Sequence, residues 1–187
     1  MAYFTAVLSH SSGGYRAVDY DIRDAANLDD LLETMRSGGE DEGEAVAVIE
    51  HEDEWFALVR LSAADEVKVF LSDVHAVAES PFAELFVDYL DARQDEYESD
   101  EDIEEESAAP VADEDAEVDD EEDDEVVPML DLEDDAEWGG DADVFADLGV
   151  PAEELLEQAQ THASDPARVV AHVGEAVGFA DQLEAAR

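Results

Sequence analysis

The chain has 187 residues, a formal net charge of -48 from 56 Asp and Glu against eight Lys and Arg, and no cysteine. This charge disfavours direct binding to nucleic acid or to an anionic membrane surface, because both depend on cationic side chains, and it makes a basic protein the natural partner. The lack of cysteine excludes disulfides, thiolate metal sites and a cysteine nucleophile, and it fits a reducing cytoplasm.

Alternating side chains at the start of the chain predict a β-hairpin. Apolar residues recur at every second position within residues 3–9 and 15–22, which is the period of a strand. Between them, Ser11-Ser12-Gly13-Gly14 is typical of a turn that joins antiparallel strands. From Asn27 the period changes to three and four, so we expect a helix of about three turns with Asn27 as its N-cap.

Three further strands and a second helix follow. The strands are predicted at residues 45–49, 55–61 and 67–71, and the connections between them are too short for parallel crossovers. Ser80 and Pro81 then mark the start of a helix with an apolar face. The expected fold class is α+β, with a mainly antiparallel five-stranded sheet and two helices on one face, forming a domain over residues 1–94.

The middle of the chain is an acidic tract. Residues 95–147 hold 28 of the 56 acids and no Lys or Arg, and such a segment buries too little apolar surface to offset its chain entropy. We expect a disordered linker over residues 95–140, acting either as a solvated spacer or as a cover for a basic surface. Apolar side chains within it are the candidate partner-binding residues: Val126, Val127, Met129, Leu130, Leu132 and Trp138. Trp138 either fastens the linker to a folded domain or anchors a partner.

Residues 141–187 are predicted to form a small helical domain. Gly149 ends a short helix and Pro151 opens the next, while Pro166 opens a third helix that Gly178 ends. With roughly forty residues, this unit is near the lower limit for independent folding. We therefore expect it to dock either on the first domain or on a partner.

Five stretches of the two folded ends resemble the tRNA adenosine deaminase-associated proteins of actinobacteria. The resemblance is carried by Met1–Phe4, Glu52–Arg60, Val69–Asp73, Leu148–Leu156 and Gly178–Glu184. That family takes its name from gene adjacency to a tRNA adenosine deaminase and has no assigned catalytic residues. The resemblance implies an accessory protein whose partner is such a deaminase.

The residues themselves offer no catalytic or metal site. A zinc deaminase needs His-x-Glu with Pro-Cys-x-x-Cys, whereas this chain has no cysteine and none of its five histidines begins His-x-Glu. We therefore expect no enzyme activity, no cofactor and no metal. No window holds the eighteen or so apolar residues of a membrane helix, so we expect a cytoplasmic protein. The alternative function is an acidic mimic of nucleic acid, or anti-factor, that competes for a basic nucleic-acid-binding surface.

Overall fold

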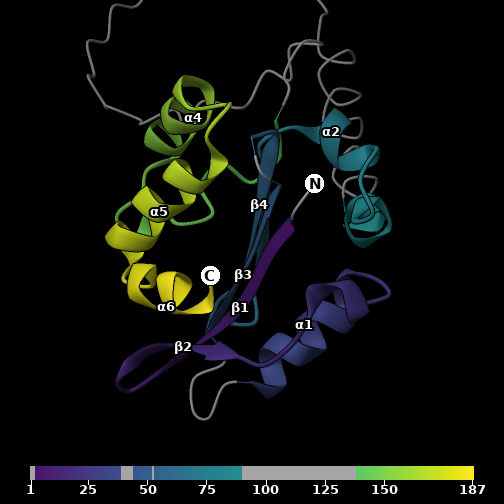
Figure 1. Cartoon of the computed structure of the whole chain (residues 1–187). Coiled ribbons are helices and arrows are strands. Elements are labelled where there is room, and N and C mark those ends of the chain that lie inside the picture. Colours follow the sequence, from purple (N-terminus) through teal and green to yellow (C-terminus); the bar gives the residue numbers. More distant parts are fainter. Residues whose placement is uncertain (1–2, 39–43, 52, 90–137) are drawn as a thin grey trace, which may run out of the picture.

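The computed structural model describes residues 3–38, 44–51, 53–89 and 138–187. Its centre is an antiparallel sheet in the order β2-β1-β3-β4-β5-β6 (Figure 1). The strands are β1 (Tyr3–Ser11), β2 (Gly14–Val18), β3 (Ala45–His51), β4 (Trp55–Leu61), β5 (Val67–Leu71) and β6 (Gly139–Gly140). Strands β3, β4 and β5 form the predicted meander, and β1 pairs with β3 as well as with its hairpin partner β2.

The two faces of the sheet are both covered. Every residue of β3 and of β4 is buried, and successive side chains of a strand point to opposite faces. Phe56 and Leu58 of β4 therefore belong to one hydrophobic core, while Trp55 and Ala57 belong to a second one on the other face. This continuous burial explains why residues 45–49 and 55–59 read as uninterrupted apolar runs.

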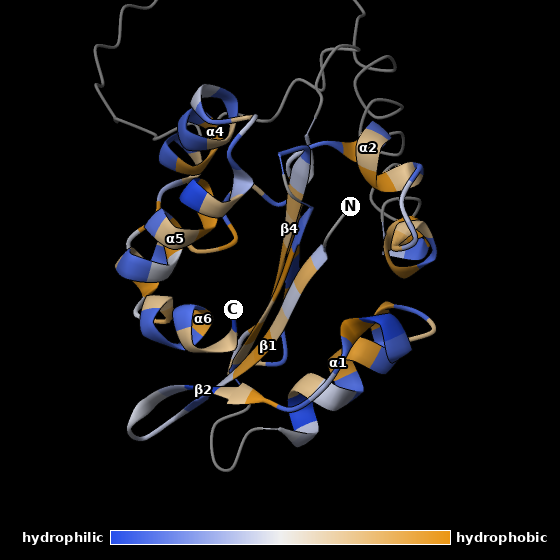
Figure 2. Cartoon of the chain, in the orientation of Figure 1, coloured by the Kyte–Doolittle hydropathy of each residue, from blue (hydrophilic) through white to orange (hydrophobic). Residues whose placement is uncertain are grey.

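Helix α1 (Leu28–Ser37) and the short helix α2 (Val74–Ala78) cover the second core, together with helical residues 83–89. The predicted cap is present, because the Asn27 side chain accepts a hydrogen bond from the backbone N–H of Asp30. The α1 side chains that face the sheet are the predicted stripe of Leu28, Leu31, Leu32 and Met35. Figure 2 shows the same pattern, with apolar residues turned inward and polar residues outward.

The first core lies under the C-terminal helices. These are α4 (Ala152–Thr161), α5 (Pro166–Val177) and α6 (Ala180–Ala186), preceded by the 3-10 helix η2 (Ala146–Leu148). Their inward side chains, including Phe145, Val173 and Phe179, pack against sheet residues such as Val48 and Phe70. The C-terminal residues and the sheet therefore share one hydrophobic core.

The structure confirms the α+β class and corrects the number of strands. The sheet has six strands instead of five, because Gly139 and Gly140 pair with Leu71 and Phe70 after the acidic tract. The two helices expected within residues 1–94 do lie on one face, because α1 and helical residues 83–89 both pack in the second core, and the C-terminal helices cover the opposite face (Figure 1). A two-residue glycine strand has no alternating pattern that could reveal it in the sequence.

A 3-10 helix, η1 (Ile22–Asp24), stands where the end of the second strand was predicted. Strand β2 ends at Val18, and Ile22 is buried in the second core. The alternation of residues 15–22 therefore has two causes. Residues 15–18 alternate because they belong to β2, and Ile22 continues the pattern because it is buried in η1. The division into separately folding domains at residues 1–94 and 141–187 stays a prediction. Residues of both predicted domains belong to the first core, and a truncated chain can test whether each part folds alone.

Candidate functional site

The most heavily engaged charge of the described residues is Arg60 on β4. Its side chain is 7% exposed and points toward the C-terminal segment, where it donates to both carboxylate oxygens of Asp147, at 2.8 Å for Oδ2, and to the carbonyl of Val144 at 3.0 Å. Glu44 accepts a further bond from it at 3.2 Å. Arg60 thus joins β4 to the residues before and within η2.

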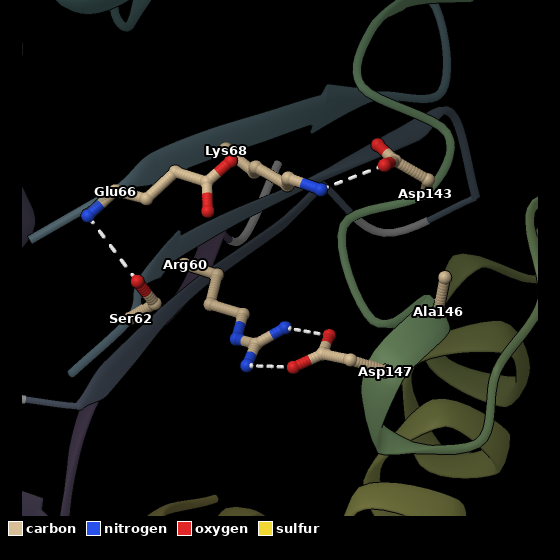
Figure 3. A pocket seen from close by; sticks show the side chains of 7 residues that line it. All are labelled: Arg60, Ser62, Glu66, Lys68, Asp143, Ala146 and Asp147. Atoms are coloured by element: carbon tan, nitrogen blue, oxygen red, sulfur yellow. Dashed lines mark hydrogen bonds and ion pairs between the residues drawn. The ribbon is translucent and has the colours of Figure 1, made fainter. Parts of the chain in front are cut away.

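A pocket of about 350 Å³ opens beside this arginine. Six of its seven lining residues are polar or charged, and they come from β4, β5, the turn between these strands and the C-terminal segment: Arg60, Ser62, Glu66, Lys68, Asp143, Ala146 and Asp147. In Figure 3 the Lys68 ammonium points at Asp143, at 2.6 Å, parallel to the Arg60–Asp147 pair. The pocket walls are therefore held together by two ion pairs that cross from the sheet to the C-terminal segment.

The contact between Arg60 and Asp147 stabilises the charged forms of both residues. The hydrogen bonds from Arg60 lower the pKa of Asp147, and the same contact raises the pKa of Arg60. A general acid or base needs a pKa near the working pH. The shifts move the pKa values of both Asp147 and Arg60 further from neutral pH. We therefore interpret the pocket as a structural junction between the sheet and the C-terminal segment.

The junction predicts a specific pH dependence for Asp147→Asn. The folded-state pKa of Asp147 is depressed below 3.8, so its contribution to stability is present above that value and is lost as the pH falls through the folded pKa. The side chain is 64% exposed, which limits the effect to about 1 kcal/mol. Urea melts of both proteins should differ at pH 7, and the difference should shrink steadily as the pH is lowered below 3.8, while Asp181→Asn serves as an exposed control. A difference that does not shrink as the pH falls would contradict the prediction.

The described residues that flank residues 90–137 meet at one edge of the sheet. The Tyr89 hydroxyl donates to the Asp141 carboxylate, which also accepts from the backbone N–H of Val69 at 3.0 Å. The Asp141 backbone N–H donates to the Val69 carbonyl at 2.6 Å. Tyr89 precedes residues 90–137 and Asp141 follows them, so the chain leaves this edge and returns to it.

We therefore expect the tract to be removable without loss of the fold. A flexible Gly-Ser linker of about ten residues, with an r.m.s. span of roughly 18 Å, should replace residues 93–136 because the ends are within side-chain reach of each other. The thermal midpoint should change by less than a few degrees, as followed by circular dichroism. Adding Tyr89→Phe to the shortened chain removes the hydrogen bond to Asp141 and should lower the thermal midpoint. Failure of the shortened chain to fold would contradict the expectation that the tract is removable.

Trp138 is the one predicted partner-binding residue within the described part of the chain. Its ring stacks on Phe70, with centroids 6.0 Å apart and an interplanar angle of 22°, and it is partly buried against the first core. This packing matches the alternative in which it fastens the tract to the folded domain. Its role toward a partner stays a prediction. The other predicted residues lie outside the described residues: Val126, Val127, Met129, Leu130 and Leu132.

The histidines considered as metal ligands lie in separate places. His51 is buried at the end of β3, His75 lies on α2 and His162 follows α4. His172 on α5 contacts Glu154 through Nε2 at 2.7 Å. Among the residues that the structure describes, no group of three or more His, Asp or Glu could hold a metal ion. In the same residues no helix is long and apolar enough to cross a membrane.

Most of the described basic side chains form ion pairs with acids of the same chain. Of the eight Lys and Arg, Arg93 lies outside the described residues, and five of the remaining seven form ion pairs. The pairs are Arg23 with Asp21, Arg36 with Asp65, Arg60 with Asp147 and Glu44, Lys68 with Asp143, and Arg187 with Glu50. Arg16 also has an interaction within the chain. The described surface therefore offers little positive charge to an anionic partner.

Sequence reasoning missed the residues that build the junction. Arg60 reads as one polar residue in an apolar strand, and a charge inside such a run is a signal, since buried charges are normally paired. Its partners could not be identified, because Asp147 is one of 28 acids in the tract region. Tyr89 lies in the helix predicted after Pro81, but the sequence does not reveal that its hydroxyl donates to Asp141.

Comparison with known families gives one match. A family model described as Rv3753c-like tRNA adenosine deaminase-associated protein matches residues 3–107, which is more than half of the chain. The resemblance seen in the sequence is thereby confirmed for the stretches within residues 3–107, and the stretches in the C-terminal helices lie beyond the match. No curated protein and no solved structure matches the chain.

Proposed function

Because the chain belongs to the family of Rv3753c-like tRNA adenosine deaminase-associated proteins, we propose that it is a non-catalytic accessory or regulatory protein that binds a tRNA adenosine deaminase. Family membership is the observation that carries the proposal. An association with tRNA modification also supports a place in the cytoplasm.

Charge supports a basic protein as the partner. An enzyme that binds tRNA must present cationic side chains to the phosphates, and such a surface is complementary to a chain of net charge -48. Five of the seven described Lys and Arg residues form ion pairs with acids of the same chain, which disfavours direct binding to tRNA. The pocket beside Arg60 supports the non-catalytic part of the proposal, because the pKa shifts of Arg60 and Asp147 stabilise their charged forms.

Within the tract, we propose that the apolar residues contact the partner while the acids around them attract it. The apolar contacts are Val126, Val127, Met129, Leu130 and Leu132, with Trp138 at the margin of the folded part. A Val127→Ser, Leu130→Ser double variant should weaken binding at every salt concentration. A matched Ala108→Ser, Ala109→Ser variant in the same tract should bind like the parent chain.

A second candidate function is an acidic mimic of nucleic acid that competes for basic surfaces in general. The concentration of half the acids between residues 95 and 147 favours it. Its affinity would come from long-range attraction alone, which is screened within about 10 Å at 0.1 M salt. It predicts capture of many basic proteins at low salt and of none at moderate salt.

The deciding experiment is a binding measurement between the purified chain and the tRNA adenosine deaminase of the same genome. We expect a complex that survives moderate salt and weakens when residues 93–136 are replaced by the Gly-Ser linker. Deaminase activity on tRNA, measured with and without the chain, then gives the sign of any regulation. Failure to bind the deaminase at any salt concentration would overturn the proposal, and indiscriminate binding limited to low salt would favour the mimic.

A further inference from the structure

Strand β2 forms the outer edge of the sheet, at the side opposite the ends of the acidic tract. Its register with β1 places Ser11 opposite Gly14, His10 opposite Tyr15, Ser9 opposite Arg16 and Leu8 opposite Ala17. In an antiparallel pair, opposed residues alternate between exchanging both backbone hydrogen bonds and exchanging none. The tight turn at Ser12-Gly13 makes the pair next to it a bonded one.

Two residues of β2 consequently turn their backbone groups outward. The alternation leaves Tyr15 and Ala17 without bonds to β1. His10, which is opposite Tyr15, donates its N–H away from β2, to the carbonyl of Glu44 at 2.8 Å. Among the residues that the structure describes, no backbone group bonds to Tyr15 or Ala17 from the outer side. Their N–H and C=O groups form a row that an added strand could complete.

The charged side chains around this edge are mostly acidic, although the exposed Arg16 lies on β2 itself. Asp19 follows β2 and is exposed. On one side of the strand lies α6 (Figure 1), which contacts β2 and carries the exposed Asp181 and Glu184. A second copy of the chain is a poor occupant, because β2-to-β2 pairing would bring together two molecules of net charge -48. Charge complementarity favours an extended segment that carries Lys or Arg.

We propose that the outer edge of β2 docks an extended, basic segment of the partner deaminase, which adds to the sheet as a further strand. This inference rests on the proposed function and gives the partner a second contact, at the opposite edge from the tract. Backbone hydrogen bonds from Tyr15 and Ala17 hold the segment, and Asp19, Asp181 and Glu184 attract its cations. Binding at this edge is therefore less sensitive to salt than the attraction of the tract.

Ala17→Pro tests the proposal by removing a single hydrogen-bond donor, the backbone N–H of residue 17. Proline lacks the N–H, and an edge strand tolerates it where that group faces solvent, so the sheet should remain intact. The loss of one hydrogen bond and the bulk of the ring should weaken deaminase binding by about tenfold, and at 0.5 M salt as much as at 0.1 M. Ala17→Thr, which keeps the N–H and suits a strand, is the matched control and should bind like the parent chain.

Hydrogen exchange tests the same edge without a substitution. The amides of Tyr15 and Ala17 should exchange quickly in the free chain and become protected in the complex, whereas those of Arg16 and Val18 should be protected in both states. Unchanged exchange at Tyr15 and Ala17 in a formed complex would overturn this inference while leaving the proposed function intact. Absence of any complex would instead contradict the proposed function. A dimer of the chain that Ala17→Pro abolishes would also overturn the inference, since the edge would then serve a second copy.

Discussion

A chain that ends at residue 94 is expected to lose cooperative folding. The truncation exposes the sheet face that the C-terminal helices cover, and with it six side chains that are at most 2% exposed in the whole chain. These are Leu8, Val46, Val48, Phe56, Leu58 and Phe70. Burial of each such side chain is worth roughly 1.5–3 kcal/mol, so their sum is comparable with the total stability of a domain, about 5–15 kcal/mol.

Circular dichroism and size-exclusion chromatography measure this outcome. We expect residues 1–94 alone to aggregate or to melt without a cooperative transition. Addition of a separate peptide of residues 138–187 should restore a cooperative melt, because no covalent link is needed for the shared core to form. A monomeric fragment of residues 1–94 with a sharp transition would show instead that the division predicted from the sequence describes two separately folding domains.

Gly140→Ala is expected to be among the most destabilising single substitutions in the chain. Gly140 has a φ of 89°, and a Cβ built on it would lie 2.1 Å from the carbonyl oxygen of Val69. Two costs combine here: the left-handed backbone conformation and a clash with a backbone atom that cannot turn away. We expect a loss of roughly 3 kcal/mol or more in the free energy of unfolding.

Gly178→Ala separates the two costs. Gly178 has a similar φ of 97°, but a Cβ there would meet nothing within 4 Å, so the variant should lose only about 1–2 kcal/mol, the conformational cost. Urea denaturation of both variants gives the comparison. Equal losses would mean that β6 moves away from Val69 at little cost, which would weaken the view that Gly139 and Gly140 fasten the returning chain to the sheet.

The elements with strong periodicity were predicted almost to the residue. Strands β4 and β5 have the expected bounds, and α1 has the expected cap at Asn27, because local spacing and capping chemistry determine them. The helix α2, over Val74–Ala78, was missed, since a helix of about one turn is too short to display a helical period.

The relation between distant segments could not be predicted in the same way. The apolar stripes of α4 and α5 show that these helices have a buried face, but they do not say which surface covers it. Val46 and Val48, which pack against these helices, lie in an apolar run that indicates a strand covered on both faces. Such a strand implies a second layer over the sheet, but not which segment forms it. A buried Arg60 likewise implies carboxylate partners, but the chain has too many acids for the sequence to identify them.

The hydrogen bond between Tyr89 and Asp141 also bears on how freely the acidic tract can differ in length. The entropy cost of closing a loop grows slowly with its length, by about 0.6 kcal/mol for each doubling. Residues can therefore be inserted into or removed from the tract at little cost to the stability of the sheet. The net charge of this protein can thus change with the length of this one segment, without compensating substitutions in the two hydrophobic cores.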